Sequence, residues 1–543
     1  MRKHWRLIIC SLILFAIILF VYLPITRTFY QQDEWYGFGK YLSNGLNSIF
    51  LSTNGIISII LGEGRILTKF LYYTFYRFSP LNVVPVAIFS IVLHIINSIL
   101  VFLLAFKIFK KTIPAFLGSL FFAVNSVSQS TITWPAASIN ALPSTLLILV
   151  AIIFFFNYIE LNKVKWLIFS FFLIYISLFF RETGIFLFLL LPLFSLFYKK
   201  YSFTEFFKKY WYFFMALGMI VIFRLYEFKS TEHQVALFLT GSSKHFFDAI
   251  IVRSILYPIT SFSLSIVPPD IFLNFARYIT NVYYPFIPEA QFILIAQTIV
   301  LDFMALFFTG IILLISFLMY KKSDKNIQKQ IVFWFIFLFT SFLPYIIISK
   351  SYSYLESRYY YVSSIAWSMI FAWGLYLFQQ KIRIKPICYL VSMLYLLFIF
   401  VHVNVIKTDL NKLINDSQIR IGIISQLNTL KPTLQQNKNI FLITGDSDYY
   451  LIGNKIPFQS GMGYNLMSLY YNSGKIPKEF INEAFLFEIG SQGYKEMGDY
   501  GFGYFSDSKS LKEIIKNNKL SEEIVIALYY DSKENKINRV SFK

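Results

Sequence analysis

The chain has 543 residues, of which 57% are hydrophobic, 20% aromatic and only 14% charged, and its formal net charge is +20. Soluble globular proteins average about 45–50% apolar and about 25% charged residues, so one water-soluble core cannot hold this much apolar surface. Almost all of the positive excess lies in residues 1–405, between apolar runs, which indicates membrane topology rather than nucleic acid as a partner. The composition predicts a polytopic protein in a lipid bilayer, and it excludes a disordered chain, a fibrous repeat and a soluble Rossmann-type enzyme.

Apolar runs of membrane-spanning length recur along the chain. A hydrocarbon core about 30 Å thick requires roughly 20 apolar residues in an α-helix. Eleven runs reach or approach that length, at residues 7–26, 82–106, 112–125, 137–157, 165–180, 183–198, 209–226, 292–320, 330–349, 359–379 and 385–405. The first follows basic residues, as in a signal peptide, but no small-x-small cleavage site comes after it, so we predict an uncleaved anchor.

Basic residues concentrate in every second connection between these runs. They occupy the N-terminus and residues 107–111, 163–165, 199–209, 321–329 and 381–385. The short connections in between hold only Arg181, Lys350 and Arg358. Because positively charged connections stay in the cytoplasm, we predict a multi-pass protein of the cell membrane with a cytoplasmic N-terminus and an extracytoplasmic tail.

The predicted outer face carries two long loops, residues 27–81 and 227–291, which contrast with short inner connections. Within the second loop, residues 236–267 are apolar enough to suggest a twelfth span, but charged residues interrupt them. We predict that this segment forms interfacial helices against the outer leaflet. The chemistry of the protein is therefore expected on its outer side.

The tail of the chain has an ordinary charge density. Strand-like runs occur at residues 439–444 and 523–530, and a helix-like run at residues 510–518, a pattern that favours a small α/β domain. The expected fold class is thus an α-helical polytopic membrane domain, residues 1–405 with about 11 transmembrane helices, followed by an extracytoplasmic α/β domain, residues 406–543.

Two adjacent carboxylates, Asp33 and Glu34, lie a few residues past the first span. They fit a solvated loop or an acidic cap at a helix N-terminus. They also fit a catalytic role, because carboxylates next to a membrane surface are costly unless they are solvated or used. These residues alone leave both interpretations open.

Two further outer connections carry paired charges. In the first, Arg181 and Glu182 separate two apolar spans. The arginine can extend its charged group to the membrane surface, and the glutamate can complement the dipole at a helix N-terminus. Alternatively, both residues can bind a polar ligand. In the second, Glu356 and Arg358 lie among tyrosines, where they can form a surface ion pair worth little.

Other polar groups have simpler explanations. His94 and Asn97 share one face of the second span, which favours a hydrogen bond between buried helices. Cys10 and Cys388 both lie in apolar runs, so neither a disulfide framework nor a metal site is expected from them. The sequence contains no phosphate-binding glycine loop, zinc-protease motif or serine-hydrolase motif.

Several short motifs together resemble one enzyme family in order and spacing. They are His94-Ile-Ile-Asn97, Phe121-Phe-Ala-Val-Asn125, Thr133-Trp134-Pro135, Arg181-Glu182-Thr183-Gly184-Ile185 and Glu356-Ser357-Arg358-Tyr359. Residues 1–405 are similar to protein O-mannosyltransferase-like members of the GT-C superfamily, which are polyprenyl-phosphate-dependent glycosyltransferases. Departures from that pattern are Asn125-Ser126 in place of His-Pro, Asn140 near an expected Arg, and the extra Ser357.

This resemblance implies transfer of a sugar from a polyprenyl-phosphate donor to a cell-envelope glycan, lipid or protein acceptor, with inversion at the sugar carbon. Asp33 would be the general base, with Glu34 as its partner or as a metal-capable ligand; no other cofactor is expected, although a divalent metal would fit. The donor phosphate would be bound by Arg358, Arg181 and, as a weaker candidate, Arg65. Glu182 and Glu356 would orient these arginines or hold the acceptor.

Two other classes of protein compete with this interpretation. A transporter of lipid-linked sugars would carry inverted repeats and polar residues near the bilayer midplane, whereas the polar residues here gather at the outer ends of the spans. An O-antigen-type polymerase or ligase is also polytopic with a large outer loop, but it would explain neither the Asp33-Glu34 pair nor the C-terminal domain.

Overall fold

The structure of the protein is a computed structural model. It describes residues 2–31, 34, 37, 41, 45–50, 65–79, 81–199, 201–230, 243–283, 290–321, 323–346, 357–381, 385–429, 439–445, 494–505, 507–521, 523–531 and 533–539.

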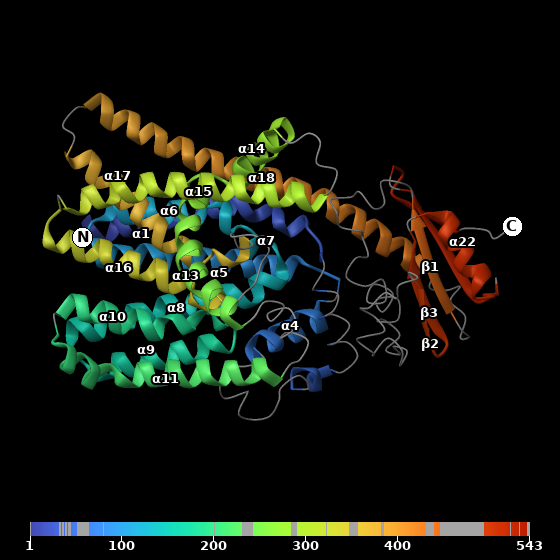
Figure 1. Cartoon of the computed structure of the whole chain (residues 1–543), viewed down its shortest axis with the longest axis horizontal. Coiled ribbons are helices and arrows are strands. Elements are labelled where there is room, and N and C mark those ends of the chain that lie inside the picture. Colours follow the sequence, from blue (N-terminus) through green and yellow to red (C-terminus); the bar gives the residue numbers. More distant parts are fainter. Residues whose placement is uncertain are drawn as a thin grey trace.

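A bundle of helices forms most of the described chain (Figure 1). Its longer helices are α1 (Arg2–Tyr22), α4 (Ile66–Phe78), α5 (Val84–Phe109), α6 (Thr112–Ala123), α8 (Pro135–Leu161), α9 (Val164–Leu178), α10 (Leu187–Lys199), α11 (Phe203–Ser230), α13 (Ser243–Ile266), α14 (Pro269–Tyr283), α15 (Ala290–Lys321), α16 (Lys325–Ser341), α17 (Ser363–Lys381) and α18 (Lys385–Thr429). Short helical turns join them: η1 (Leu23–Arg27), η2 (Gly45–Ile49), η3 (Ser126–Ser128), α7 (Ser130–Thr133), η4 (Glu182–Phe186), η5 (Leu343–Tyr345) and η6 (Ser357–Tyr359).

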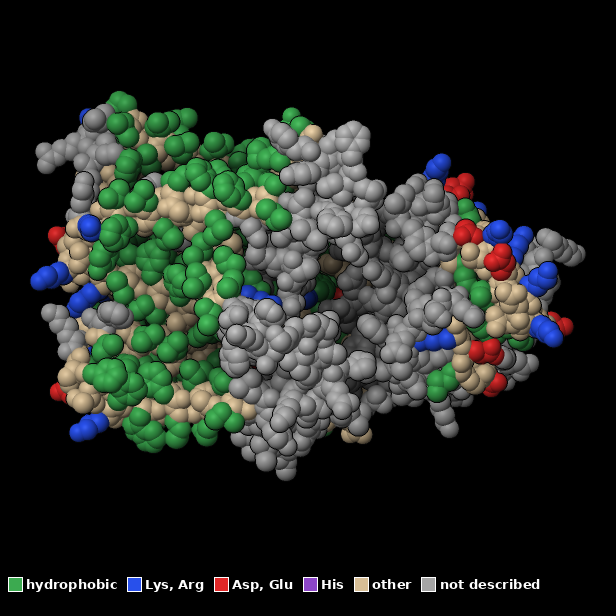
Figure 2. All heavy atoms as spheres, in the orientation of Figure 1, with side chains coloured by type: hydrophobic (Ala, Val, Ile, Leu, Met, Phe, Trp, Pro, Cys, Tyr) green, Lys and Arg blue, Asp and Glu red, His purple; other side chains and the backbone are tan. Residues whose placement is uncertain are grey.

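Each of the eleven predicted apolar runs overlaps a helix. Among the described residues, five helices are long and apolar enough to cross a membrane, or six if α13 and α14 count as one bent span, and several shorter apolar helices accompany them. The outward faces carry large apolar side chains such as Phe20, Phe303 and Leu396, which are 68%, 71% and 62% exposed. Figure 2 shows hydrophobic side chains covering this part of the molecule. Exposure of so continuous an apolar surface to water is unfavourable, so this surface faces lipid.

The helices alternate in direction. The N-terminus and the C-terminal ends of α10, α15 and α17 lie at one end of the bundle, and the β-sheet lies beyond the other end (Figure 1). The lysine-rich connections fall at the end that holds the N-terminus, as the alternation of basic residues predicts.

Helix α13 departs from the prediction for residues 236–267. Instead of lying along the outer surface of the bundle, its second half is enclosed by other helices. Ser265 accepts a hydrogen bond on its carbonyl from Asn125 Nδ2 at 2.9 Å, and the Ile266 carbonyl accepts one from His402 Nε2 at 3.1 Å. The helix then bends by 101° into α14. The serine and threonine hydroxyls in this half donate hydrogen bonds to backbone carbonyls of α13 itself, so these side chains can be buried.

Helix α18 continues beyond residue 405, where the last predicted apolar run ends. The helix has 45 residues, so it is about 67 Å long at 1.5 Å per residue, more than twice the thickness of a hydrocarbon core. It runs obliquely along the bundle to the sheet (Figure 1). There Gln426 donates a hydrogen bond to the Asn535 carbonyl at 2.9 Å and accepts one from Ile537 N at 2.7 Å.

The tail contains a five-stranded mixed sheet with the order β2-β3-β1-β4-β5. The strands are β1 (Asn439–Gly445), β2 (Tyr494–Met497), β3 (Tyr500–Tyr504), β4 (Val525–Asp531) and β5 (Lys536–Arg539). The central strand β1 runs parallel to β3 and β4, and the edge strands are antiparallel to their neighbours. Helix α22 (Ser508–Asn517) packs against the sheet through Leu511, which contacts the buried side chains of β1 and β4.

Candidate functional site

Five of the seven residues predicted for the site are described: Glu34, Arg65, Arg181, Glu182 and Arg358. Asp33 and Glu356 lie outside the described residues. The described five gather where η4, η6 and the beginnings of α4 and α8 meet, at the end of the bundle that faces the sheet.

Arg65 and Glu182 form a two-pronged ion pair. Arg65 Nε donates to Glu182 Oε1 at 3.0 Å, and Nη2 donates to Oε2 at 2.8 Å. The carboxylate of Glu182 raises the pKa of Arg65 above its ordinary value. Arg65 precedes α4 with a φ of +47°, a left-handed conformation that costs a non-glycine residue roughly 1–2 kcal/mol. Arg65 is therefore the predicted arginine that Glu182 orients. The ion pair links the residue that precedes α4 to η4, the turn before α10.

Arg181 is only 6% exposed and lies against two aromatic rings. Its guanidinium is 5.8 Å from the ring centroid of Tyr345 and 5.4 Å from that of Tyr359, within the range of a cation–π interaction. Within the described ranges it has no carboxylate partner and donates no side-chain hydrogen bond. Gly184 makes this tight turn possible, because a Cβ at that position would overlap the Ser177 hydroxyl.

Arg358 shares the ring of Tyr359 with Arg181. Its guanidinium is 5.1 Å from that ring centroid and 4.6 Å from the ring centroid of Trp134. The Arg358 carbonyl accepts a hydrogen bond from Thr131 at 3.2 Å, which fixes η6 beside α7. The indole Nε1 of Trp134 is buried and has no hydrogen-bond partner in the described structure. Two cations therefore flank the ring of Tyr359, and the ring on the other side of Arg358 carries an unused donor, the Trp134 indole N–H.

Glu34 is buried, with 1% exposure, and binds the N-terminus of α8. One of its oxygens accepts a hydrogen bond from Ala136 N at 3.1 Å, and the other accepts one from Gln31 N at 3.2 Å. Ala136 is the second residue of α8, where backbone amides lack partners within the helix and the helix dipole favours an anion. The carboxylate thus holds the loop after α1 beside Trp134, which is the N-cap residue of α8.

The remaining motif residues support the fold. His94 Nε2 donates to the Ala123 carbonyl at 2.9 Å, so its Nδ1 accepts from the Tyr361 hydroxyl at 2.8 Å. Asn97 donates to the Leu142 carbonyl at 3.1 Å. The prediction of a hydrogen bond between buried helices is therefore confirmed for both residues. Asn140 bonds back to the Ala136 carbonyl of its own helix at 2.8 Å.

Among the buried donors without a partner in the described residues, the Trp134 indole and Arg420 concern the candidate site, and the sequence did not predict a role for either. The Trp134 indole belongs to a recognised motif, but the sequence does not tell whether its Nε1 is paired. Arg420, on α18, is 5% exposed, and its Nη1 has no hydrogen-bond partner in the described part of the chain. No sequence signal marks it, because it sits in an ordinary amphipathic stretch.

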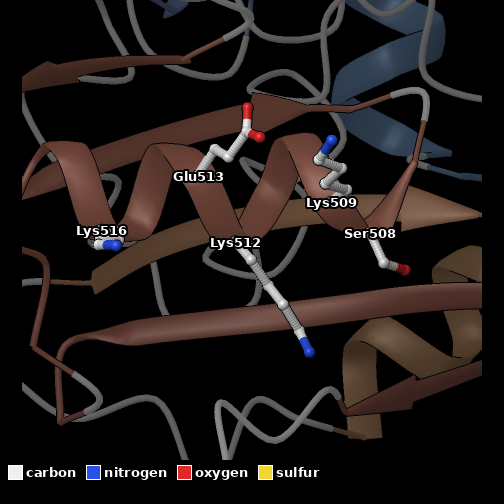
Figure 3. A pocket seen from close by; sticks show the side chains of 5 residues that line it. All are labelled: Ser508, Lys509, Lys512, Glu513 and Lys516. Atoms are coloured by element: carbon white, nitrogen blue, oxygen red, sulfur yellow. The ribbon is translucent and has the colours of Figure 1, made fainter.

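The described residues contain no metal-binding group, and an open pocket lies on α22 rather than at the arginines. No group of three or more His, Cys, Asp or Glu side chains suited to a metal occurs among the described residues. An open pocket of about 380 Å³ lies on α22, lined by Ser508, Lys509, Lys512, Glu513 and Lys516 (Figure 3). All of its lining residues belong to α22, which lies at the sheet and outside the helix bundle (Figure 1).

No protein-family model and no curated protein matches the chain. Among solved structures, it is similar to the Archaeoglobus fulgidus oligosaccharyltransferase in its apo form, with a TM-score of 0.38 at 13% identity over 84% of this chain and 64% of that chain. It is also similar to the Archaeoglobus fulgidus oligosaccharyltransferase AglB bound to an inhibitory peptide and a dolichol-phosphate, with a TM-score of 0.39 at 12% identity over 97% and 69% of the two chains. The chain thus spans less than two thirds of the first of these proteins. Likeness at this level does not establish a common fold or activity.

Proposed function

We propose that the protein is a GT-C-type membrane glycosyltransferase of the cell envelope. It would transfer a sugar from a polyprenyl-phosphate donor to a glycan, lipid or protein acceptor on the outer side of the membrane. The observation that supports this best is the pair Arg181 and Arg358 on the ring of Tyr359, at the end of a lipid-facing bundle.

Electrostatics favours an anionic ligand at this pair. Two guanidinium groups that share one ring repel each other, and the burial of Arg181 strengthens that repulsion by lowering the local dielectric. A phosphate between them would relieve the repulsion, and a guanidinium can bind two phosphate oxygens at once. The unpartnered Trp134 indole would supply a neutral donor to the same group.

The chemistry requires a base and a stabilised leaving group. In the proposed step the acceptor oxygen attacks the anomeric carbon, the bond from that carbon to the phosphate oxygen breaks, and polyprenyl phosphate leaves. Asp33 would take the acceptor proton, and the arginines would stabilise the charge that develops on the phosphate. Attack from the face opposite the leaving group inverts the sugar carbon.

Glu34 would act as a positioning residue in this scheme. Both of its oxygens accept backbone amides, so it holds the peptide next to Asp33 against the start of α8 rather than taking a proton. Glu182 would act similarly through Arg65, and Glu356 would orient Arg358 or hold the acceptor. The site would face outward, with the N-terminus in the cytoplasm and the C-terminal sheet outside.

The direct test is transfer of labelled sugar in proteoliposomes that contain the full chain and a panel of polyprenyl-phosphate sugars. Loss of one charge-assisted hydrogen bond, worth about 1.5–3 kcal/mol, predicts that Arg358→Ala and Arg181→Ala each reduce transfer by about 10- to 100-fold. Arg27→Ala is the matched control, because Arg27 is an exposed arginine at the end of η1. Equal transfer by all four proteins would refute the proposal, and movement of intact donor across the bilayer without transfer would favour a transporter.

A further inference from the structure

Arg420 is a buried cation that the proposed mechanism does not use. It lies on the outer part of α18, beyond the last apolar run, and only 5% of its surface is exposed. Its Nη1 has no hydrogen-bond partner among the residues that the structure places. A buried donor without a partner costs about 1–3 kcal/mol, and more when it is charged.

The face of α18 that carries Arg420 is fixed against the loop after α1. Ser417, three residues earlier on that face, accepts a hydrogen bond on its hydroxyl from Phe29 N at 2.8 Å. Earlier in the same helix, the Gln129 amide donates to the Asp409 carboxylate. The two contacts hold this part of α18 against the bundle, and the Arg420 side chain is buried there.

Two carboxylates act on Arg420, but neither is paired with it among the described residues. Asp416 and Glu34 act on it electrostatically, but neither forms a salt bridge with it in the part of the chain that the structure describes. Both oxygens of Glu34 accept backbone amides. The guanidinium therefore keeps donors for an additional ligand, beside the carboxylate that anchors the proposed catalytic loop.

We propose that Arg420 binds a phosphate-class oxyanion, as a second anion position next to Glu34. The assignment rests on the proposed function, because it adds to the donor-phosphate position at Arg181 and Arg358. The anion comes either from the lipid-phosphate of the donor or from a phosphate carried by the acceptor. The same helix also contacts the C-terminal sheet through Gln426.

The first arm of the test measures thermal stability of the full chain in phosphatidylcholine nanodiscs without ligand. Arg420→Met removes a buried charge and keeps its volume, so it should leave the melting temperature unchanged or raise it. A residue with a purely structural ion-pairing role would behave in the opposite way, and a clear fall in the melting temperature of the ligand-free variant would overturn the proposal. Arg420→Lys, which keeps the charge, is the second variant and is used for the binding titrations.

The second arm titrates the same nanodiscs with inorganic phosphate and with farnesyl phosphate. We expect Arg420→Met to weaken inorganic phosphate binding by about 10- to 100-fold and Arg420→Lys to weaken it less, because lysine lacks the planar fork. A parallel loss for farnesyl phosphate assigns the anion to the donor lipid, and its retention assigns it to the acceptor. Affinity within twofold of wild type for both probes, or no phosphate binding by wild type, would overturn the inference.

A third protein separates this inference from the proposed function. Arg358→Gln should weaken farnesyl phosphate binding. If it does not, the donor-phosphate assignment fails, whereas the role of Arg420 is still decided by its own titration. Binding is measured without any sugar transfer, so a failure to find the correct donor sugar does not affect the outcome.

Discussion

Replacement of Glu34 by Gln separates its capping role from a catalytic one. The carboxylate accepts two backbone amides at 3.1 and 3.2 Å. Gln can accept only one of them, because its amino group would face the second N–H donor. The loss is one charge-assisted hydrogen bond, about 1.5–3 kcal/mol, plus about 0.3–1 kcal/mol of interaction with the dipole of α8. We therefore expect Glu34→Gln to destabilise the protein by about 2–4 kcal/mol.

Thermal denaturation of the purified protein in nanodiscs, followed by the loss of soluble protein, measures this change. Glu513→Gln is the matched control, since Glu513 is exposed on α22 and should tolerate the substitution. If Glu34 is the base, stability should stay at the wild-type value while transfer falls by about 10²–10⁴. A melting temperature equal to that of wild type would therefore refute the capping role of Glu34.

Three further predictions follow from the same structure. Asp33→Asn should lower transfer by about 10²–10⁴ while membrane insertion is retained, and near-normal transfer would remove Asp33 as the base. A reporter fused after Lys543 that works only outside the cytoplasm should be active, and inactivity with good expression would reverse the proposed orientation. Gly184→Ala should reduce thermal stability and transfer, with partial rescue by Ser177→Ala, because its new methyl group would overlap the Ser177 hydroxyl, whereas Gly218→Ala has open space and should be neutral.

The helices were predictable because each depends on a local property, the length of an apolar run. Predicted strands at residues 439–444 and 523–530 correspond to β1 and β4 for the same reason. The predicted apolar run at residues 385–405 ends before helix α18 does. Hydropathy falls after residue 405, but helix formation does not require an apolar sequence, and α18 continues to Thr429 through polar residues.

The partners of the charged residues could not be predicted, because they come from distant parts of the chain. Arg65 and Glu182 are 117 residues apart, and Glu34 and Ala136 are 102 apart. The sequence allowed a cap for a following helix as one role of the acidic pair, whereas Glu34 binds the start of the distant helix α8 and Asp33 lies outside the described residues. It also could not predict the burial of Arg420, which depends on the packing of α18 against the loop after α1.

The same limit explains the error at α13. Its charged residues lie in the first half of the helix, whereas the half that packs into the bundle carries hydroxyl residues whose hydrogen bonds close within the helix. The charged residues that interrupt the segment therefore suggested a surface helix for the whole of it. The enclosing helices α15 and α17 decide the burial, and they are specified elsewhere in the chain.

The central claim is that Arg358 binds the phosphate of a lipid-linked sugar donor, and equilibrium binding of that donor to the full chain in nanodiscs tests it most directly. Arg358→Ala should weaken donor binding by about 10- to 100-fold, and Arg358→Lys should recover only part of the loss, because lysine cannot bind two oxygens in one plane. Donor affinity that is unchanged in Arg358→Ala, or fully restored in Arg358→Lys, would contradict the account.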